Sequence, residues 1–207
     1  MVFAHVRPTA TERTPLPPAL HSRALADLQF IRNTMASATS YTAFSGWGLV
    51  LVGIGALLCG LIALQRPRLV DQLNLWIVDA GLSLAVGALS SVLKARSAGQ
   101  SLTVGPIRKF SLSFAPAILA GGVLTATLIR TASAGLLPGV WILLYGTGLA
   151  SAGALSVRII PIIGGCFFAL GAVALISDPW WANALLMIGF GGLHVVLGLV
   201  IARRFGG

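Results

Sequence analysis

The chain has 207 residues, of which 57 % are apolar and only 9 % are charged, and its formal net charge is +9. Soluble domains are about 45–50 % apolar and about 25 % charged, so this composition excludes an ordinary water-soluble surface. The length leaves no room for a separate soluble domain beside a membrane domain. The positive charges lie between apolar runs, which is typical of membrane topology and argues against nucleic-acid binding.

The N-terminal part of the chain differs from the rest. Residues 1–18 contain four prolines and no periodic apolar face, which predicts a disordered cytoplasmic tail. Over residues 19–40, Leu25, Leu28, Ile31 and Met35 recur at helical spacing, which predicts a short amphipathic helix. This helix could lie on the inner membrane surface or against the cytoplasmic helix ends, or it could extend the first membrane span.

Residues 41–205 are predicted to form an all-α, polytopic membrane domain with six transmembrane helices. Each apolar run has about 20 residues, which at about 1.5 Å per residue matches the roughly 30 Å hydrocarbon core of a bilayer. Pro116 and Pro161 are expected in the first turns of the third and fifth helices. The predicted spans are 44–65, 71–93, 110–131, 136–157, 159–177 and 182–203.

Lysine and arginine residues are unevenly distributed between the two sides of these spans. Arg66, Arg68 and Arg130 flank the loops of one side, and the other eleven lie on the opposite side. The positive-inside rule then predicts that the N- and C-termini are both cytoplasmic. The first apolar run is too long for a cleavable signal and is expected to remain as an anchor.

The even-numbered spans share a sequence pattern. GLSLAVGAL from Gly81, GLASAGALS from Gly148 and GLHVVLGLV from Gly192 each begin with Gly-Leu and repeat a glycine five or six residues later. This pattern predicts three two-span hairpin repeats. Because a two-span repeat starts and ends on the same side, its copies would be parallel, which lowers the expectation of an alternating-access transporter.

Four segments resemble an uncharacterised family of small six-span bacterial membrane proteins, from about Asp27 to the C-terminus. They are YTAFSGWG, GPIRKFSLSFAP, GLLPGVWILLYGTGLASAGALSVRIIP and GFGGLHVVLGLVIARR. The family has no established activity, so the resemblance implies a bacterial inner-membrane location but no catalytic residue. The three-hairpin layout, with GIGALLCGLIAL and ALGAVALISDPWW, is also similar to six-span acid-resistance membrane proteins of the enteric type.

Small residues recur within the predicted spans. Apolar burial does not drive helices together in lipid, so close approach depends on small side chains. The predicted helix-packing positions are Gly60, Gly87, Gly121, Gly148, Gly165 and Gly198.

Four polar residues form a candidate intramembrane site: Asp79, Tyr145, His194 and Arg130. Asp79 is expected about 10 Å below the outer surface, where an exposed carboxylate would be costly, so it should face the bundle. It could be a proton-titratable or cation-binding group, or a structural carboxylate paired with Arg130 or hydrogen-bonded to Tyr145. His194 is expected to form a hydrogen bond between helices rather than to bind a metal.

The sequence contains no paired carboxylates, phosphate loop or nucleophile elbow, so no enzyme activity, catalytic residue, metal or cofactor is expected. We interpret the chain as a lipid-embedded, non-enzymatic protein that acts by helix packing with itself or a membrane partner. The alternative is a small-solute or proton transporter or channel with a polar path near Asp79, Tyr145 and His194. One continuous water-accessible cavity would favour transport, and separate contacts in a dry bundle would favour packing.

Overall fold

The computed structural model describes residues 22–23, 25–31, 44–97, 106–154 and 156–205. The chain divides into two units, Met1–Ser37 and Ala38–Gly207, which are described separately. In the first unit, residues 22–23 and 25–31 are helical with exposed side chains, within the predicted amphipathic segment. The tail predicted over 1–18 and the remainder of the predicted 19–40 helix lie outside the described residues.

The described part of the second unit is all-α. Six of its helices are long and apolar enough to cross a membrane, which indicates a multi-pass membrane protein. Their bounds agree with the predicted spans to within a few residues. The elements are α2 (Gly46–Ala63), α3 (Leu69–Ser97), α4 (Pro106–Arg130), η1 (Ala134–Leu136), α5 (Leu137–Gly153), α6 (Ile159–Ile176), η2 (Pro179–Trp181), α7 (Ala182–Leu186), the π-helical segment η3 (Met187–Leu193) and α8 (His194–Arg204).

Two helix starts illustrate how local sequence sets these bounds. Ser45 caps α2, where its hydroxyl accepts a hydrogen bond from the Gly48 N–H at 3.3 Å. Pro161 is the third residue of α6, as expected for a helix start. The expectation for Pro116 is wrong because α4 already begins at Pro106 and continues through Pro116. The missing N–H of Pro116 therefore removes one hydrogen bond inside α4.

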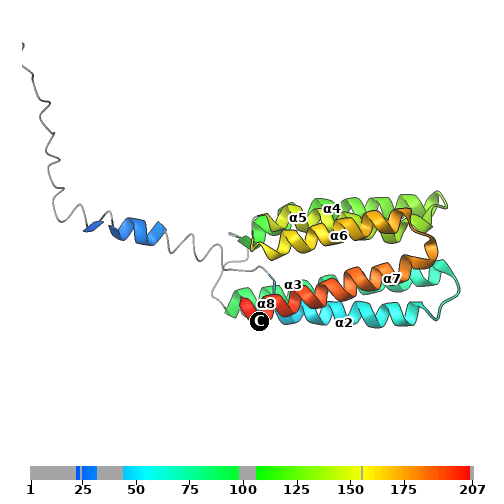
Figure 1. Ribbon diagram of the computed structural model, residues 1–207, viewed down its shortest axis with the longest axis horizontal. Helices are drawn as coiled ribbons and strands as arrows, with labels where there is room; N and C mark the ends of the chain where they lie inside the picture. The colour runs from blue at the N-terminus through cyan, green and yellow to red at the C-terminus, as the bar shows by residue number, and fades with distance from the viewer. Residues whose placement is uncertain (1–21, 24, 32–43, 98–105, 155, 206–207) are drawn as a thin grey trace, which may run out of the picture. The chain divides into compact units, whose positions relative to one another are not determined.

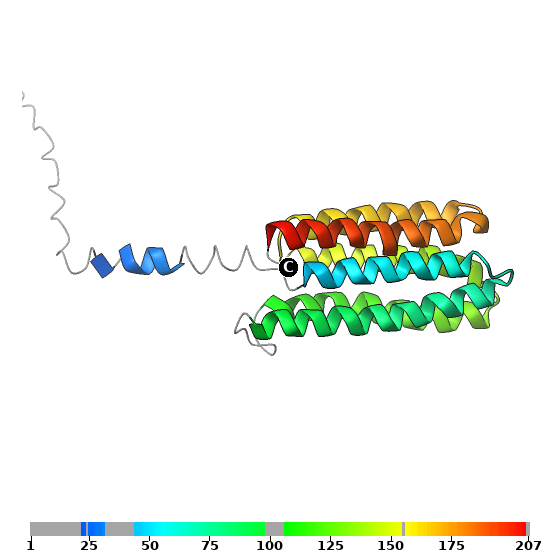
Figure 2. The same cartoon turned by 90° about the horizontal axis from the view of Figure 1, so that it is seen from below.

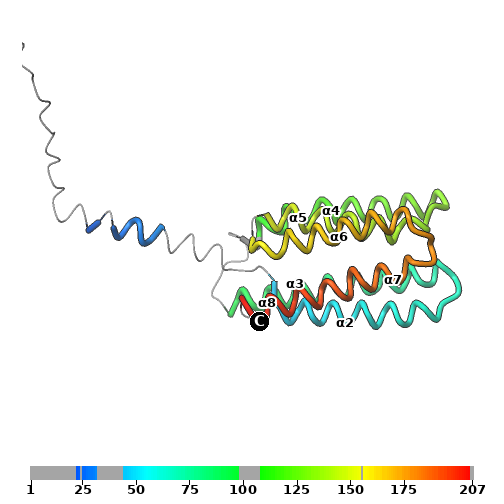
Figure 3. Tube along the Cα trace, viewed as in Figure 1, coloured from blue at the N-terminus to red at the C-terminus, as the bar shows by residue number. Residues whose placement is uncertain are grey.

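The helices form two layers of three, α8–α2–α3 and α6–α5–α4 (Figures 1 and 2). The most extensive contact joins α5 to α6, and α2 packs against both α3 and α8. The tube in Figure 3 shows that successive helices run in alternating directions, so α2 starts where α8 ends. The two halves of the chain thus meet through α2 and α8, which are far apart in the sequence.

Glycines allow the closest helix contacts. A Cβ at Gly146 would collide with the main chain of Phe168, and one at Gly164 would collide with the main chain of Ala150, across the α5–α6 contact. A Cβ at Gly198 would lie 2.7 Å from the carbonyl oxygen of Gly46, across the α2–α8 contact. These two interfaces are therefore held by close backbone approach, as expected for helices in lipid.

Helices α3 and α4 are the most exposed of the six. Of the 29 residues of α3, only Leu73, Trp76 and Ala95 are buried, and the apolar stretch of α4 has no buried residue. Each packs along a single stripe, α3 on α2 and α4 on α5, and contacts between α3 and α4 are sparse at most. The wider faces of both helices are left without a neighbour among the described residues.

Candidate functional site

Tyr145 and His194 form a hydrogen-bonded pair in the interior of the bundle. The Tyr145 hydroxyl lies 2.6 Å from Nε2 of His194. Tyr145 lies near the middle of α5, and His194 is the first residue of α8, with 3 % of its surface exposed. Two of the four residues of the candidate site are therefore direct partners, and they join the two layers.

A π-helical segment immediately precedes His194. Met187–Leu193 has the wider π-helical winding between α7 and α8, a feature that often marks functional positions in helices. Nδ1 of His194 forms no hydrogen bond of acceptable geometry, although the main-chain carbonyls of Gly189 and Phe190 lie nearby. Because a tyrosine hydroxyl can donate to Nε2, the neutral imidazole would carry its hydrogen on Nδ1, facing these carbonyls.

Aromatic rings surround the pair. The centroid of the Tyr145 ring lies 5.3 Å from Phe114, 4.9 Å from Phe167 and 5.2 Å from Phe190. Phe190 stacks on the His194 ring at a centroid distance of 6.1 Å. Phe167 is fully buried. These rings pack around the pair, in which His194 is buried and Tyr145 is partly buried, and their edge-to-face contacts stabilise the packing beyond simple burial.

Asp79 lies elsewhere in the bundle, on α3. A Cβ built on Gly55 would lie 3.6 Å from Oδ1 of Asp79, so the carboxylate is beside the middle of α2. Gly53 faces Gly191 and Val195 instead, and residues two apart on a helix point about 200° apart. Asp79 and His194 are therefore on opposite faces of α2. Among the described residues, Asp79 forms neither a hydrogen bond nor an ion pair.

The comparisons with known proteins identify no relative. A scan against protein-family models, a search of curated proteins and a search of solved structures each found no match to this chain.

The fourth residue of the candidate site, Arg130, ends α4 and is exposed. It forms no ion pair with Asp79, and the Tyr145 hydroxyl is bonded to His194, so neither predicted structural partner contacts the carboxylate. Asp79 is ten residues from the start of α3 at Leu69, and its carboxylate is level with the middle of α2. The four residues are therefore distributed over at least two separate places.

The six predicted packing glycines also differ from one another. A Cβ at Gly60, Gly148 or Gly198 would collide with a residue of another helix, whereas a Cβ at Gly121 would lie in ordinary contact with Leu144, 3.8 Å away. A Cβ at Gly87 or Gly165 would meet nothing within 4 Å. Gly87 and Gly165 therefore do not mediate packing among the described residues, because the helix faces that carry them have no described neighbour there.

Asn183 is a buried polar residue that the sequence analysis did not select. Its side-chain oxygen accepts a hydrogen bond from Nε1 of Trp76 at 2.9 Å, and its Nδ2 donates to the carbonyl of Gly60 at 3.0 Å. These bonds connect α7 with α3 and α2. The sequence could have indicated this role, because Asn183 is an amide inside the last apolar run and a polar side chain in lipid needs hydrogen-bond partners on other helices.

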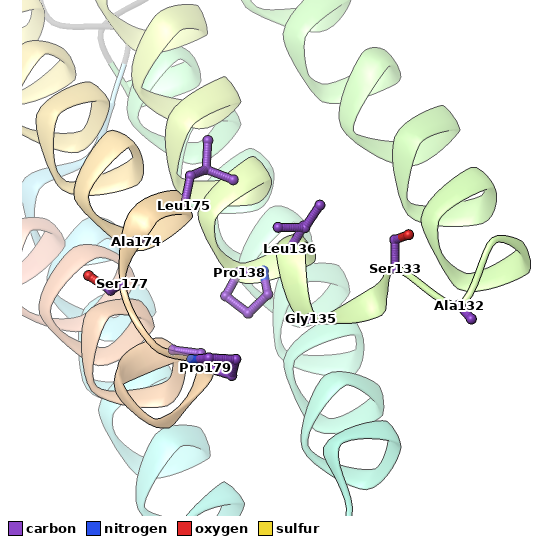
Figure 4. Close-up of a pocket in the computed structure, with 10 residues that line it drawn as sticks. Ala132, Ser133, Gly135, Leu136, Pro138, Ala174, Leu175, Ser177 and Pro179 are labelled. Carbon is purple, nitrogen blue, oxygen red and sulfur yellow. The ribbon is translucent and has the colours of Figure 1, made fainter.

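Two open, shallow hollows lie at the end of the bundle that carries Arg130. One, of about 320 Å³, is lined by the turns before α5 and after α6, including Ser133 and Ser177 (Figure 4). The other, of about 260 Å³, lies beside Arg66, Asp71 and Asn74. Asp79, Tyr145 and His194 line neither. In the part of the chain that the structure describes, no three metal-binding side chains are grouped together.

Proposed function

We propose that this chain is a non-enzymatic, multi-pass protein of the bacterial inner membrane that acts by helix packing with a second copy or another membrane protein. Its six spans would form three hairpin repeats with both termini in the cytoplasm, as the basic flanks and the repeated Gly-Leu segments suggest. The contact surface would be the outer faces of α3 and α4.

The observation that carries this proposal is the combination of exposure and small residues on α3 and α4. Gly81 and Gly122 are exposed, and a Cβ at either position would meet nothing within 4 Å. In lipid, small residues at such positions allow another helix to approach closely. Asp79 is not part of this open face, because it lies beside α2 and points about 200° away from Gly81.

The alternative of transport has less support. A transport path would need Asp79, Tyr145 and His194 along one water-filled route, yet α2 lies between Asp79 and His194, and aromatic rings enclose the other two. Proton flux in proteoliposomes would test this alternative with wild type and Asp79→Asn. Equal flux in both would count against it.

The packing proposal is tested by blocking the open face. Leucine at Gly81 and Gly122 fills space that is empty within the chain, so the fold should be unaffected while an incoming helix is held away. The matched control is Gly165→Leu on α6, which is equally open but lies in a different part of the bundle. Chemical crosslinking in native membranes, followed by purification of the chain, measures the assembled fraction.

We expect Gly81→Leu/Gly122→Leu to reduce the crosslinked species several-fold, and Gly165→Leu to leave it unchanged. Thermal unfolding in detergent, compared with wild type, verifies that both variants remain folded. Equal crosslinking of all three proteins, or no crosslinked species in wild type, would contradict the proposal.

A further inference from the structure

One end of the bundle carries a dense group of positive charges. Helices α3 and α8 end there, and α4 and α6 begin there. We call this surface the basic end, and its residues are Lys94, Arg96, Arg108, Lys109, Arg158, Arg203 and Arg204.

Contacts between the helix ends bring these charges together. Nζ of Lys94 donates a hydrogen bond to the Phe44 carbonyl at 3.0 Å, and the Phe44 ring lies 4.6 Å from Phe110, next to Lys109. Gly46, at the start of α2, contacts Ala202 beside Arg203 and Arg204. The charged ends of α3, α4 and α8 are thus arranged around the start of α2.

In the described part of the bundle, no carboxylate lies at the basic end. The acidic residues of the described bundle are Asp71, Asp79 and Asp178, of which the first and last lie at the opposite end and the other lies within α3. Segment 98–105 contains no charged residue. Apart from Lys94, the side chains of the basic end are exposed and form no ion pair with the described residues. An external anion can therefore bind at these exposed side chains.

The helix directions favour an anion at the starts of α4 and α6, whereas the cations in the last turns of α3 and α8 already match the helix dipole there. Arg108 and Lys109 lie in the first turn of α4, and Arg158 is the N-cap of α6. Neither helix has an acidic residue in its first turn. The N-terminus of a helix carries a partial positive charge, so cations there repel it and an anion relieves the repulsion. The main-chain N–H groups of these first turns can also donate hydrogen bonds to such an anion.

We propose that the basic end binds the headgroups of anionic phospholipids in the adjoining membrane leaflet. The bundle ends where the apolar helices stop, which is the depth at which lipid phosphates lie. Each lysine or arginine near an anionic membrane surface contributes about a five-fold increase in affinity. Exposed side chains on several helices can contact several headgroups at once, which also stabilises the helix ends.

The test compares the two ends of the same molecule. The full-length chain is purified in detergent micelles that contain equal amounts of phosphatidylglycerol and phosphatidylcholine, and the lipid retained per chain is measured by mass spectrometry. The first variant is Arg158→Gln/Arg203→Gln/Arg204→Gln. The matched control removes the same number of arginines from the opposite end: Arg66→Gln/Arg68→Gln/Arg130→Gln.

We expect wild type and the control to retain phosphatidylglycerol preferentially, and the first variant to bind it about a hundred-fold less tightly, from about five-fold per charge. Arg108→Gln/Lys109→Gln should give an intermediate loss, and added salt should reduce the preference in wild type. Equal losses in the two triple variants, or no preference in wild type, would overturn the proposal. Displacement of the lipid by millimolar inorganic phosphate at constant ionic strength would also overturn it, because the ligand would then be free phosphate.

Discussion

The hydrogen bond between Tyr145 and His194 can be measured by a double-mutant cycle. Tyr145→Phe removes one hydroxyl and retains the ring that contacts Phe114, Phe167 and Phe190. It leaves Nε2 of the buried His194 without its hydrogen-bond partner among the described residues. An orphaned buried group costs about 1–3 kcal/mol, and hydrogen bonds between membrane helices contribute about 0.6 kcal/mol on average and about 1.7 kcal/mol at most. We expect Tyr145→Phe to lower the free energy of unfolding by about 1–2 kcal/mol.

The second arm of the cycle is His194→Leu, and the double variant removes both partners. Because the double variant has no orphaned group at this position, its loss should be smaller than the sum of the single losses by about 1 kcal/mol. Reversible unfolding in bicelles gives the free energies. Tyr145→Phe combined with Asn183→Leu is the control, since these residues share no hydrogen-bond partner and should be additive. A coupling energy near zero for Tyr145 and His194 would refute the assignment of this bond.

Two further predictions concern packing and buried polarity. Asn183→Leu should lower the free energy of unfolding by about 2 kcal/mol, because it leaves the buried Trp76 N–H without its acceptor and removes one of the two hydrogen bonds to the Gly60 carbonyl, which keeps the bond from the Leu64 N–H; unchanged thermal unfolding in detergent would contradict this. Gly164→Val should lower the free energy of unfolding by about 1–3 kcal/mol, because the new side chain meets the main chain of α5. Gly165→Val should leave it nearly unchanged, because the space around Gly165 is open. The yield of monodisperse protein in size-exclusion chromatography distinguishes the two variants, and similar yields would show that the α5–α6 contact is not as close as described.

The sequence predicted the six helices well because their signal is local. An apolar run must be long enough to cross the hydrocarbon core, and loops contain the charges, so the spans follow from composition alone. α3 extends beyond its predicted end at 93 because Lys94 and Arg96 can continue a helix whose end reaches the headgroup region. The π-helical segment was not predicted, since MIGFGGL reads as ordinary apolar helix.

The arrangement of the candidate site could not be predicted, because it depends on which face each helix presents. Tyr145 and His194 were selected as polar residues in apolar runs, but their pairing follows from the rotation of α5 and α8 about their axes. Likewise, the rotation of α2 and α3 about their own axes places Asp79 on the side of α2 that faces away from His194. Glycine spacing has the same limit, since Gly87 and Gly148 occur in similar sequence patterns, yet only Gly148 contacts another helix of the chain.

Both proposals require six membrane crossings that alternate in direction. Single cysteines at Ser97, Ser156, Ser133 and Ser177, introduced after Cys59 and Cys166 are replaced by alanine, can be labelled with a membrane-impermeant maleimide in sealed vesicles of known orientation. We predict that positions 133 and 177 react from the outside and positions 97 and 156 only from the cytoplasmic side. Labelling of positions 97 and 133 from the same side would contradict the crossing of α4 and with it the six-span fold.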